Sequence, residues 1–304
     1  MKLTIQGENH VIDVPSGAIL LDILREQGLH PDAPCGGKGI CGKCKVLVDG
    51  NEQLACQTKI DRDMAVFLPE QGTTQILSDG RTAKIQPDGA SRYAIAFDLG
   101  TTTVVAYLMD GITGELISKA SCMNPQAQYG ADVISRIQYA MQGNAPVLSS
   151  CIRGALSELT LKAAKQAGIS PDEIMVASIV GNTAMHHLLL EIDPSPLTVP
   201  PYMPAVSEAL CIPSEGILPI CPAGAIRVLP NIAGFVGADT VGCLLSTRLN
   251  QMDDLTLMID IGTNGEMVLG NKKHRIACST AAAPLLKVQE LNAACAVRRV
   301  LSTM

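Results

Sequence analysis

The feature that most constrains this 304-residue chain is a set of four cysteines between positions 35 and 56. Five residues separate Cys35 from Cys41, two separate Cys41 from Cys44, and eleven separate Cys44 from Cys56. The start of the chain, residues 1–6, alternates like a strand and lacks the long apolar stretch of an export signal. We therefore expect a cytoplasmic protein, in which clustered cysteines indicate metal or redox chemistry more often than disulfides. The other seven cysteines are scattered singly, as small buried hydrophobic residues are.

Four thiolates are the usual ligands of a [2Fe–2S] cluster, so we predict one on these cysteines. Four glycines share their loop: Gly36, Gly37, Gly39 and Gly42. Without Cβ atoms, such a loop can wrap closely around a cluster and turn its N–H groups toward the sulfur atoms. The arrangement resembles the ferredoxin family, with a longer first gap than the plant type and an early fourth cysteine. A four-cysteine zinc site is the alternative, and the asymmetric spacing and the glycines favour iron–sulfur.

The elements around the cysteine loop predict a small α+β domain of the ferredoxin-like (β-grasp) type over residues 1–75. Apolar residues at helical spacing between Ser16 and Gly28 predict a helix capped by Ser16. The predicted strands cover residues 3–5, 11–14, 45–48 and 65–68. Residues 76–91 are rich in polar residues, Gly and Pro, which predicts a linker before a second domain over residues 92–304.

Two related strings in the second domain predict a pair of strand–turn–strand hairpins that bind phosphate. Residues 93–108 and 257–269 each carry Asp, an aliphatic residue, Gly and Thr at the end of an apolar strand. Gly and Thr at such a turn let backbone N–H groups and hydroxyls reach phosphate oxygens, and the carboxylate can hold Mg²⁺ through water. The predicted phosphate-site residues are Asp98, Gly100, Thr101, Thr102, Asp260, Gly262 and Thr263.

The paired strings resemble the superfamily of acetate and sugar kinases, Hsc70 and actin, in which they flank an ATP cleft. A [2Fe–2S] domain joined to such an α/β unit is similar to the reductive activators of corrinoid-dependent enzymes. The resemblance covers most of residues 1–282, including the strings at 180–187 and 231–239. It implies use of ATP and Mg²⁺, and transfer of one low-potential electron from the cluster to a Co(II) corrinoid, which becomes Co(I). It also implies a corrinoid protein as acceptor and a low-potential donor that reloads the cluster.

Between the two hairpins the pattern is mixed α/β. It predicts helices over residues 132–141 and 147–168, a strand over 174–180, a helix opened by Asn182, and an extended surface segment over 194–230. Two further features have more than one interpretation. For His186 and His187 we expect an ordinary helical pair, one buried and one exposed, with a metal or catalytic role as the alternative. For Asp239 we expect helix capping, with a reach to Mg²⁺ as the alternative.

The resemblance ends at about Ala283, where family members continue into a Gly-Pro-Ala-Phe-Glu-Gly-like turn. Only 44 residues follow Asp260 (304 − 260), so we expect an incomplete second lobe and a truncated product, through a reading-frame shift near codon 283. A lobe without its remaining elements leaves apolar surface and strand edges uncovered. We therefore expect weak or absent ATP binding by this chain.

Composition narrows the functional classes. The net charge of −6 argues against a nucleic-acid-binding protein, and no apolar run is long enough for a membrane span. Three functions remain open: an ATP-linked reductive activator of a corrinoid protein, a simple electron carrier with an inactive ATPase-like scaffold, and a small-molecule kinase with a regulatory cluster.

Overall fold

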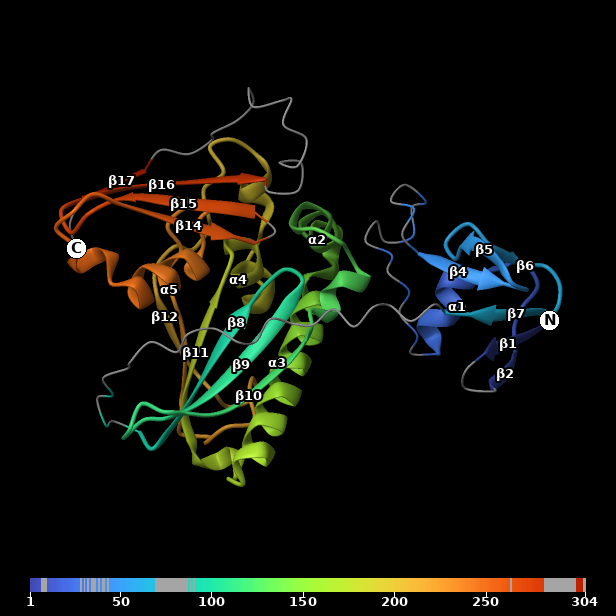
Figure 1. The fold of residues 1–304 in the computed structure, drawn as a ribbon, viewed down its shortest axis with the longest axis horizontal. Coiled ribbons are helices and arrows are strands. Elements are labelled where there is room, and N and C mark those ends of the chain that lie inside the picture. Colours follow the sequence, from blue (N-terminus) through green and yellow to red (C-terminus); the bar gives the residue numbers. More distant parts are fainter. Residues whose placement is uncertain are drawn as a thin grey trace. The chain divides into compact units, whose positions relative to one another are not determined.

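A computed structural model describes residues 1–6, 10–27, 44–68, 91–262, 264–281 and 299–302, with the single residues 29, 31, 33, 37, 39, 42, 87 and 89. The chain forms two compact units: residues 1–75 with 127–136, and residues 76–126 with 137–304. Figure 1 labels the elements of both units.

The smaller unit is built on a mixed sheet with the strand order β2-β1-β7-β4-β5. The sheet strands are β1 (Lys2–Gln6), β2 (His10–Asp13), β4 (Lys45–Val48), β5 (Asn51–Leu54) and β7 (Met64–Phe67). β1 and β7 run parallel, with Leu3 opposite Met64, and the neighbouring pairs in the sheet run antiparallel. This arrangement confirms the four strands predicted from the sequence and adds β5.

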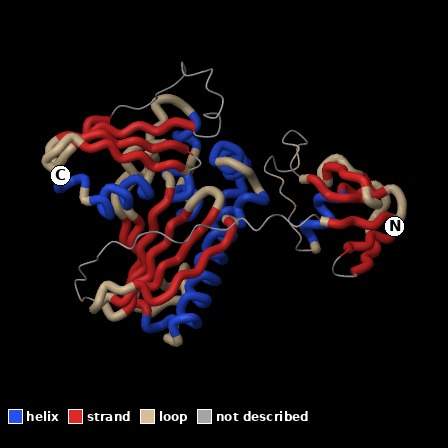
Figure 2. Tube along the Cα trace, viewed as in Figure 1, coloured by secondary structure: helices blue, strands red, loops and turns tan. Residues whose placement is uncertain are grey.

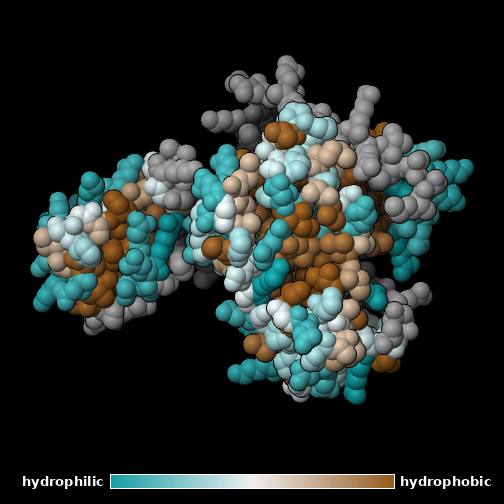
Figure 3. All heavy atoms as spheres, turned by 180° about the vertical axis from the view of Figure 1, so that it is seen from behind, coloured by the Kyte–Doolittle hydropathy of each residue, from teal (hydrophilic) through white to brown (hydrophobic). Residues whose placement is uncertain are grey.

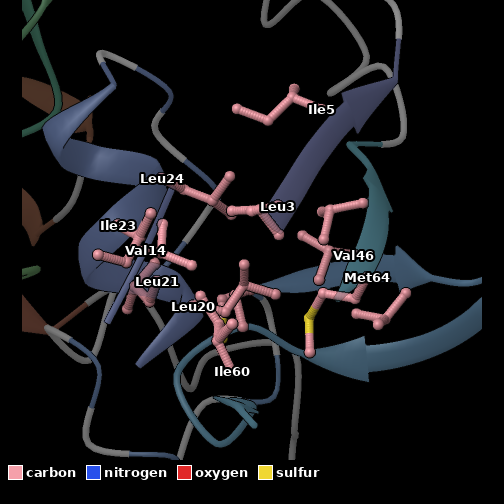
Figure 4. Close-up of a cluster of buried hydrophobic side chains, with 14 of the residues drawn as sticks. Leu3, Ile5, Val14, Leu20, Leu21, Ile23, Leu24, Val46, Ile60 and Met64 are labelled. Atoms are coloured by element: carbon pink, nitrogen blue, oxygen red, sulfur yellow. The ribbon is translucent and has the colours of Figure 1, made fainter. Parts of the chain in front are cut away.

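Helix α1 (Leu20–Glu26) packs against this sheet. The helix buries Leu20, Leu21 and Leu24 against Leu3 and Val46 of the sheet (Figure 4). Alternate positions of the strands face the same core, as expected for a sheet with one buried face. The fold of this unit is therefore supported by its own hydrophobic core.

The expected capping of α1 by Ser16 is wrong. The N-cap is Ile19, which has no side-chain cap, because Ala18–Ile19 forms a short strand, β3, paired with β6 (Lys59–Ile60). A pairing between segments far apart in sequence sets the start of the helix in place of local capping. Gly28, the predicted helix stop, lies outside the described residues.

The larger unit contains a six-stranded sheet with the order β10-β9-β8-β11-β13-β12. Its strands are β8 (Tyr93–Leu99), β9 (Thr103–Asp110), β10 (Leu116–Met123), β11 (Ile174–Gly181), β12 (Leu210–Pro213) and β13 (Ala225–Val228). β8, β11 and β13 run parallel, while β9, β10 and β12 run antiparallel to their neighbours. The segment expected to lie extended over the surface, 194–230, thus contributes two strands to the sheet, and that expectation is corrected.

Helices and short helical turns lie between and after these strands in the chain, and residues 127–136 among them belong to the smaller unit. The α-helices are α2 (Val133–Tyr139), α3 (Ala145–Ala167), α4 (Thr183–Leu190) and α5 (Ala238–Thr247). A π-helical turn covers Ala140–Asn144, and 3-10 turns cover Pro125–Gln128, Pro171–Glu173, Ser195–Thr198 and Leu249–Gln251. The long α3 lies along β9 and β10, as the blue and red tubes of Figure 2 show. The predicted helices around 132–141 and 147–168 and the helix after Asn182 are confirmed.

A second sheet in the larger unit has the order β14-β15-β16-β17 and is antiparallel throughout. Its strands are β14 (Thr256–Ile261), β15 (Asn264–Gly270), β16 (His274–Ala281) and β17 (Arg299–Ser302). One face packs on α5, where Met258, Val268 and Ala277 are buried with Val241 and Leu244. This sheet and α5 form one layered substructure with its own core.

The opposite face of this sheet carries apolar side chains in the open. Leu257, Ile259, Ile261, Leu269 and Ile276 are between 44% and 83% exposed. Leu257 lies opposite Leu269, which lies opposite Ile276, so the exposed residues are neighbours across strands. We call these five residues the outer apolar face.

Hydrophobic surface on the larger unit is also visible from behind in Figure 3. Within the described ranges, no helix is long and apolar enough to cross a lipid bilayer.

Candidate metal and phosphate sites

Two of the four predicted cluster ligands, Cys44 and Cys56, lie side by side in the smaller unit. Their Sγ atoms are 3.3 Å apart, which is too far for a disulfide bond and close to the spacing of two ligands on one metal. Two thiolates bound tetrahedrally at about 2.3 Å, the distance that zinc takes, are about 3.8 Å apart. Cys44 is fully buried and Cys56 is half-buried. The other two predicted ligands, Cys35 and Cys41, lie outside the described residues.

The backbone around these thiols is held by hydrogen bonds that explain their position. The N–H of Ala55 donates to the carbonyl of Cys44 at 2.8 Å, and the N–H of Leu21 donates to the carbonyl of Ala55 at 3.1 Å. The tight turn at Cys56 closes with a bond from the Gln57 N–H to the Leu54 carbonyl at 2.9 Å. Cys44 and Cys56 are thus fixed to each other and to the first turn of α1.

The described glycines of the cysteine loop need to be glycine. Gly37, Gly39 and Gly42 have φ angles of +92°, +75° and +66°, a region that residues with a Cβ rarely adopt. A Cβ on Gly37 would lie 3.1 Å from Leu21 Cδ2, and one on Gly39 would lie 2.6 Å from Gln57 Nε2. All three described glycines thus have a backbone conformation that favours glycine, and Gly37 and Gly39 also lie close to a neighbouring side chain.

Replacing Gly37 with alanine should lower the amount of iron that the purified chain retains. The substitution costs about 1–2 kcal/mol through its positive φ and also pushes on Leu21. Gly17→Ala is the matched control, because Gly17 has a φ of +85° and nothing within 4 Å of its Cβ position. Both variants should unfold at a lower temperature, and only Gly37→Ala should lose iron. Equal iron content in both would show that the Gly37 region does not support the cluster.

In the larger unit, the first predicted phosphate string forms the turn between β8 and β9. Asp98 lies near the end of β8, and Gly100–Thr102 form the turn itself. The Gly100 N–H donates to the Thr103 carbonyl at 3.0 Å, and a Cβ on Gly100 would lie only 2.7 Å from that oxygen. Thr101 is buried and Thr102 is exposed. The turn is therefore tight, requires glycine, and presents one threonine to solvent.

The second predicted string forms the turn between β14 and β15. Asp260 lies at the end of β14 and Gly262 in the turn, while Thr263 lies outside the described residues. The structure brings the two strings together, because the charge of Asp260 acts on Asp98. Burial first, and then this charge, raise the pKa of the Asp98 carboxyl. The Asp98 residue is exposed, so solvent screens this interaction and its contribution to stability is small.

Asp239 joins this acidic group. The N-cap of α5 is Gly237, so the expected capping by Asp239 is wrong, and the carboxyl lies instead in the first turn of the helix. Burial, and then the charges of Asp98 and Asp260, raise the pKa of Asp239 to about 6, against the opposing effect of a hydrogen bond from the Thr240 N–H. The start of α5 can lie close to Asn182 because Gly237 has no side chain. A Cβ on Gly237 would lie 2.5 Å from Asn182 Cα.

Two further residues of this site, Glu266 and Cys243, were not predicted from the sequence. Glu266 lies opposite Asp260 in the β14–β15 ladder and is 7% exposed. Burial, and then the charge of Asp239, raise its pKa to about 7, although Ser279 donates a hydrogen bond to it at 3.2 Å. On α5, the thiol of Cys243 donates to Asp260 Oδ2 at 3.4 Å, and burial and that carboxylate raise its pKa to about 12. Glu266 belongs to the same string as Asp260, so its position in the motif was a usable signal.

The arrangement has the chemistry of a site for a cation and phosphate. Like charges placed opposite each other destabilise a fold unless something compensates them, and Mg²⁺ with its water shell is a suitable counter-charge. Among the described residues, no three His, Cys, Asp or Glu side chains are close enough to ligate one metal directly.

Comparison with known proteins identifies the chain. A family model for a 2Fe–2S iron–sulfur cluster binding domain matches residues 3–61, and one for the C-terminal domain of RACo, the ASKHA domain, matches residues 254–297. A model for the RACo middle region matches residues 93–252, which is more than half of the chain. The chain belongs to the RACo family. It thus has a ferredoxin-type domain with a [2Fe–2S] site, followed by the RACo middle region and an ASKHA-type domain.

Individual relatives of this RACo-family chain agree with the assignment. The corrinoid activation enzyme RamQ of Eubacterium limosum is 31% identical, over 91% of this chain and 60% of its own length. A solved structure titled reductive activator for corrinoid, iron-sulfur protein is 26% identical, with a TM-score of 0.60, over 92% of this chain and 63% of its own. One subunit of the Na(+)-translocating NADH-quinone reductase of Pseudomonas paraeruginosa is 33% identical over 23% of this chain and 22% of its own length.

This RACo-family chain spans about 60% of the length of the first two of these relatives. The match to the C-terminal RACo domain also extends to residue 297, beyond the end of the resemblance at Ala283 that we expect from the motifs. That boundary is therefore corrected by fourteen residues.

The two histidines of the RACo middle region are buried and hydrogen-bonded to neighbouring groups. Both His186 and His187 are at most 2% exposed, so the expectation that one is exposed is wrong. His187 Nδ1 lies 2.7 Å from the Thr183 carbonyl, and its Nε2 accepts from the Ala205 N–H at 3.1 Å. His186 Nδ1 is hydrogen-bonded to the side chain of Asn231, 45 residues away in sequence. That distant partner explains why the burial was not visible in the sequence.

Acidification should destabilise this RACo-family chain through His186. Burial first, and the neighbouring His187, lower the pKa of His186 to about 4, against 6.5 for an ordinary histidine. The unfolded chain takes up the proton first as the pH falls, so the stability is present above pH 6.5 and is lost toward pH 4. The loss amounts to about 2 kcal/mol by pH 5.

Urea unfolding at pH 7.5 and pH 5 measures this effect. His186→Gln should lose less stability between the two values than the wild type does, while the exposed His274→Gln should behave as the wild type. The same pH response in His186→Gln as in the wild type would contradict the assignment.

Proposed function

We propose that this chain is an iron–sulfur electron-transfer protein that takes part in the ATP-dependent reductive activation of a corrinoid protein, from Co(II) to Co(I). The observation that carries the proposal is the pair of thiols, Cys44 and Cys56, 3.3 Å apart in the domain that the 2Fe–2S model matches. With Cys35 and Cys41 they form the ligand set, and a [2Fe–2S] cluster bound there supplies one electron at a time.

The domain boundaries belong to the proposal. The electron-transfer domain covers residues 1–75, a linker follows over 76–91, and residues 92–304 form the nucleotide-binding part. Membership in the RACo family supports this division, because the separate family models match on either side of the linker.

The two phosphate strings supply the nucleotide site of the proposal. Asp98, Gly100, Thr101 and Thr102 of the first string and Asp260, Gly262 and Thr263 of the second bind the phosphates and hydrated Mg²⁺. Besides burial, the charges of Asp98 and Asp260 raise the pKa of Asp239, which supports a site at which a cation relieves repulsion.

Energetics explain why ATP accompanies the electron. A plant-type cluster has a potential of about −400 mV. Each 59 mV of mismatch in a one-electron transfer changes the equilibrium about tenfold, so an acceptor some 200 mV lower is disfavoured by more than about a thousandfold. Coupling to ATP, or to a conformational change of the acceptor, can pull the transfer forward. The electron comes from a low-potential one-electron donor, and the acceptor is a corrinoid protein, as the names of the relatives indicate for those proteins.

An anaerobic assay with a Co(II) corrinoid protein tests the proposal. Titanium(III) citrate serves as the donor, and absorbance follows the formation of Co(I) with and without Mg·ATP. We expect the chain to speed Co(I) formation, and Mg·ATP to increase the extent when it is added at saturating concentration, which the weak nucleotide binding expected of this chain requires. No Co(I) from the iron-loaded chain under either condition would overturn the proposal, and reduction that ignores Mg·ATP would leave a simple electron carrier.

A further inference from the structure

The turn of the first phosphate string is held in place by two asparagines from outside the string. The first is Asn124, which follows β10 and is 1% exposed. Its Nδ2 donates to the Gly100 carbonyl at 2.8 Å, and its backbone N–H donates to the Thr102 carbonyl at 2.8 Å. Its Oδ1 accepts from the Gln126 N–H at 2.9 Å, which fixes the orientation of the amide. Two carbonyls of the turn are thus drawn toward one side.

The second is Asn182, between β11 and α4. Its Oδ1 accepts from the Met185 N–H at 3.0 Å and caps the helix. Its Nδ2 donates to the buried hydroxyl oxygen of Thr101 at 2.8 Å. One amide therefore ties the start of α4 to the centre of the turn.

The sheet explains why these asparagines reach the turn. β11 runs parallel to β8 with Gly181 opposite Leu99, so the residues that follow the two strands emerge at the same edge. β10 pairs with β9 so that Met123 lies opposite Thr103, which brings Asn124 to the other side of the turn. Asn124 and Asn182 therefore contact the turn from two sides.

The hydrogen bonds from the two asparagines have a consequence for ligand binding. In a planar trans peptide the C=O and N–H point in opposite directions, so carbonyls drawn toward Asn124 direct the N–H groups of Thr101 and Thr103 away from it. The Asn182 amide fixes the orientation of the buried Thr101 side chain, and Thr102 is exposed to solvent.

We propose that Asn124 and Asn182 are positioning residues that hold the Gly100–Thr102 turn in the conformation that receives the phosphates of Mg·ATP. The inference rests on the proposed function, which places a nucleotide at this turn. Asn124 sets the direction of the backbone, and Asn182 sets the threonine side chain.

Asn182→Ser separates positioning from folding. Serine keeps an oxygen that caps α4 and loses the amide that donates to Thr101. Titration of Mg·ATP, followed by ³¹P NMR so that weak binding is measurable, should show about five- to tenfold lower affinity than for the wild type. Thermal unfolding should stay close to the wild type. A loss of stability with unchanged affinity would mean that Asn182 is only a helix cap.

A double-mutant cycle shows whether Asn182 acts through Thr101. Thr101→Val alone should weaken Mg·ATP binding, and adding Asn182→Ser should weaken it no further. Additive losses would overturn this part of the proposal. Asn124→Asp gives a second, independent variant: it keeps the oxygen for Gln126 and places a carboxylate against the Gly100 carbonyl, so affinity should fall here also.

Asn144→Ser is the matched control. The amide of Asn144 donates to the Tyr139 carbonyl at 3.3 Å, away from the turn, and its replacement should leave affinity unchanged. Wild-type affinity in Asn182→Ser, or a wild-type chain that does not bind Mg·ATP, would overturn the inference. The cobalt assay tests the proposed function separately from the affinity measurement. If the chain transfers electrons in that assay while Asn182→Ser leaves the Mg·ATP affinity unchanged, only the inference about the asparagines is overturned.

Discussion

Replacing Cys44 or Cys56 with alanine should leave the chain without its iron–sulfur cluster. Two irons and two sulfides per wild-type chain should fall to nearly none in either variant, because each loses one of four thiolates. The dithionite-reduced wild type should give a one-electron spin-resonance signal that both variants lack. Anaerobic purification followed by iron, sulfide and zinc analysis measures the effect directly.

Cys211→Ala is the control, since Cys211 is an exposed free cysteine outside the cysteine loop. It should keep both irons and the full signal. Full iron content in Cys44→Ala or Cys56→Ala would remove that residue from the ligand set. Zinc in place of iron would replace the iron–sulfur assignment with the four-cysteine zinc alternative.

The second large effect should come from Glu266. Its pKa of about 7, raised mainly by burial, compares with 4.5 for an ordinary glutamate. The folded state therefore holds a proton that the unfolded state releases, so the stability is present below pH 4.5 and is lost as the pH rises through about 7. Between pH 5 and pH 8.5 the loss amounts to about 2 kcal/mol.

Glu266→Gln should remove this loss. The glutamine can still accept the hydrogen bond from Ser279, and it carries no charge opposite Asp260. In EDTA at pH 8.5 we expect an unfolding midpoint about 5 °C above the wild type, with little difference at pH 5. Circular dichroism during heating measures both values.

The exposed Asp254→Asn is the control for a general effect of removing negative charge. Its midpoint should follow that of the wild type at both pH values. An equal rise of the unfolding midpoint in Asp254→Asn and Glu266→Gln would assign the effect to net charge. No rise in Glu266→Gln would contradict the destabilising effect of a charge on the buried Glu266 carboxyl.

The hairpins of this fold were predictable because their signals are local. In each phosphate string an apolar strand, a glycine turn and a second apolar strand follow one another, so β8–β9 and β14–β15 could be placed from the residues alone. The same holds for the cysteine loop. Cys44 and Cys56 meet because the residues between them form the β4–β5 hairpin.

What the sequence did not reveal depends on contacts between distant segments. β13 lies in a proline-rich stretch that resembles a loop, and only its pairing with β11 makes it a strand. The start of α1 is set by β3 and β6, and the burial of His186 by Asn231. Asp239 and Glu266 enter the acidic group through the packing of α5 and the register of β14 with β15. Periodicity and capping rules do not carry such information.

The outer apolar face has a practical consequence for work with this chain. Leu257, Ile259 and Ile261 project from β14, the edge strand of the described sheet, and are more than half exposed. Exposed apolar side chains of this kind favour association with other molecules, and an unpaired strand edge can pair with a strand of another chain. The concentration of protein in the tube, rather than the temperature, is then the variable that decides how long the chain stays in solution. Mild detergent and dilute handling should extend that time.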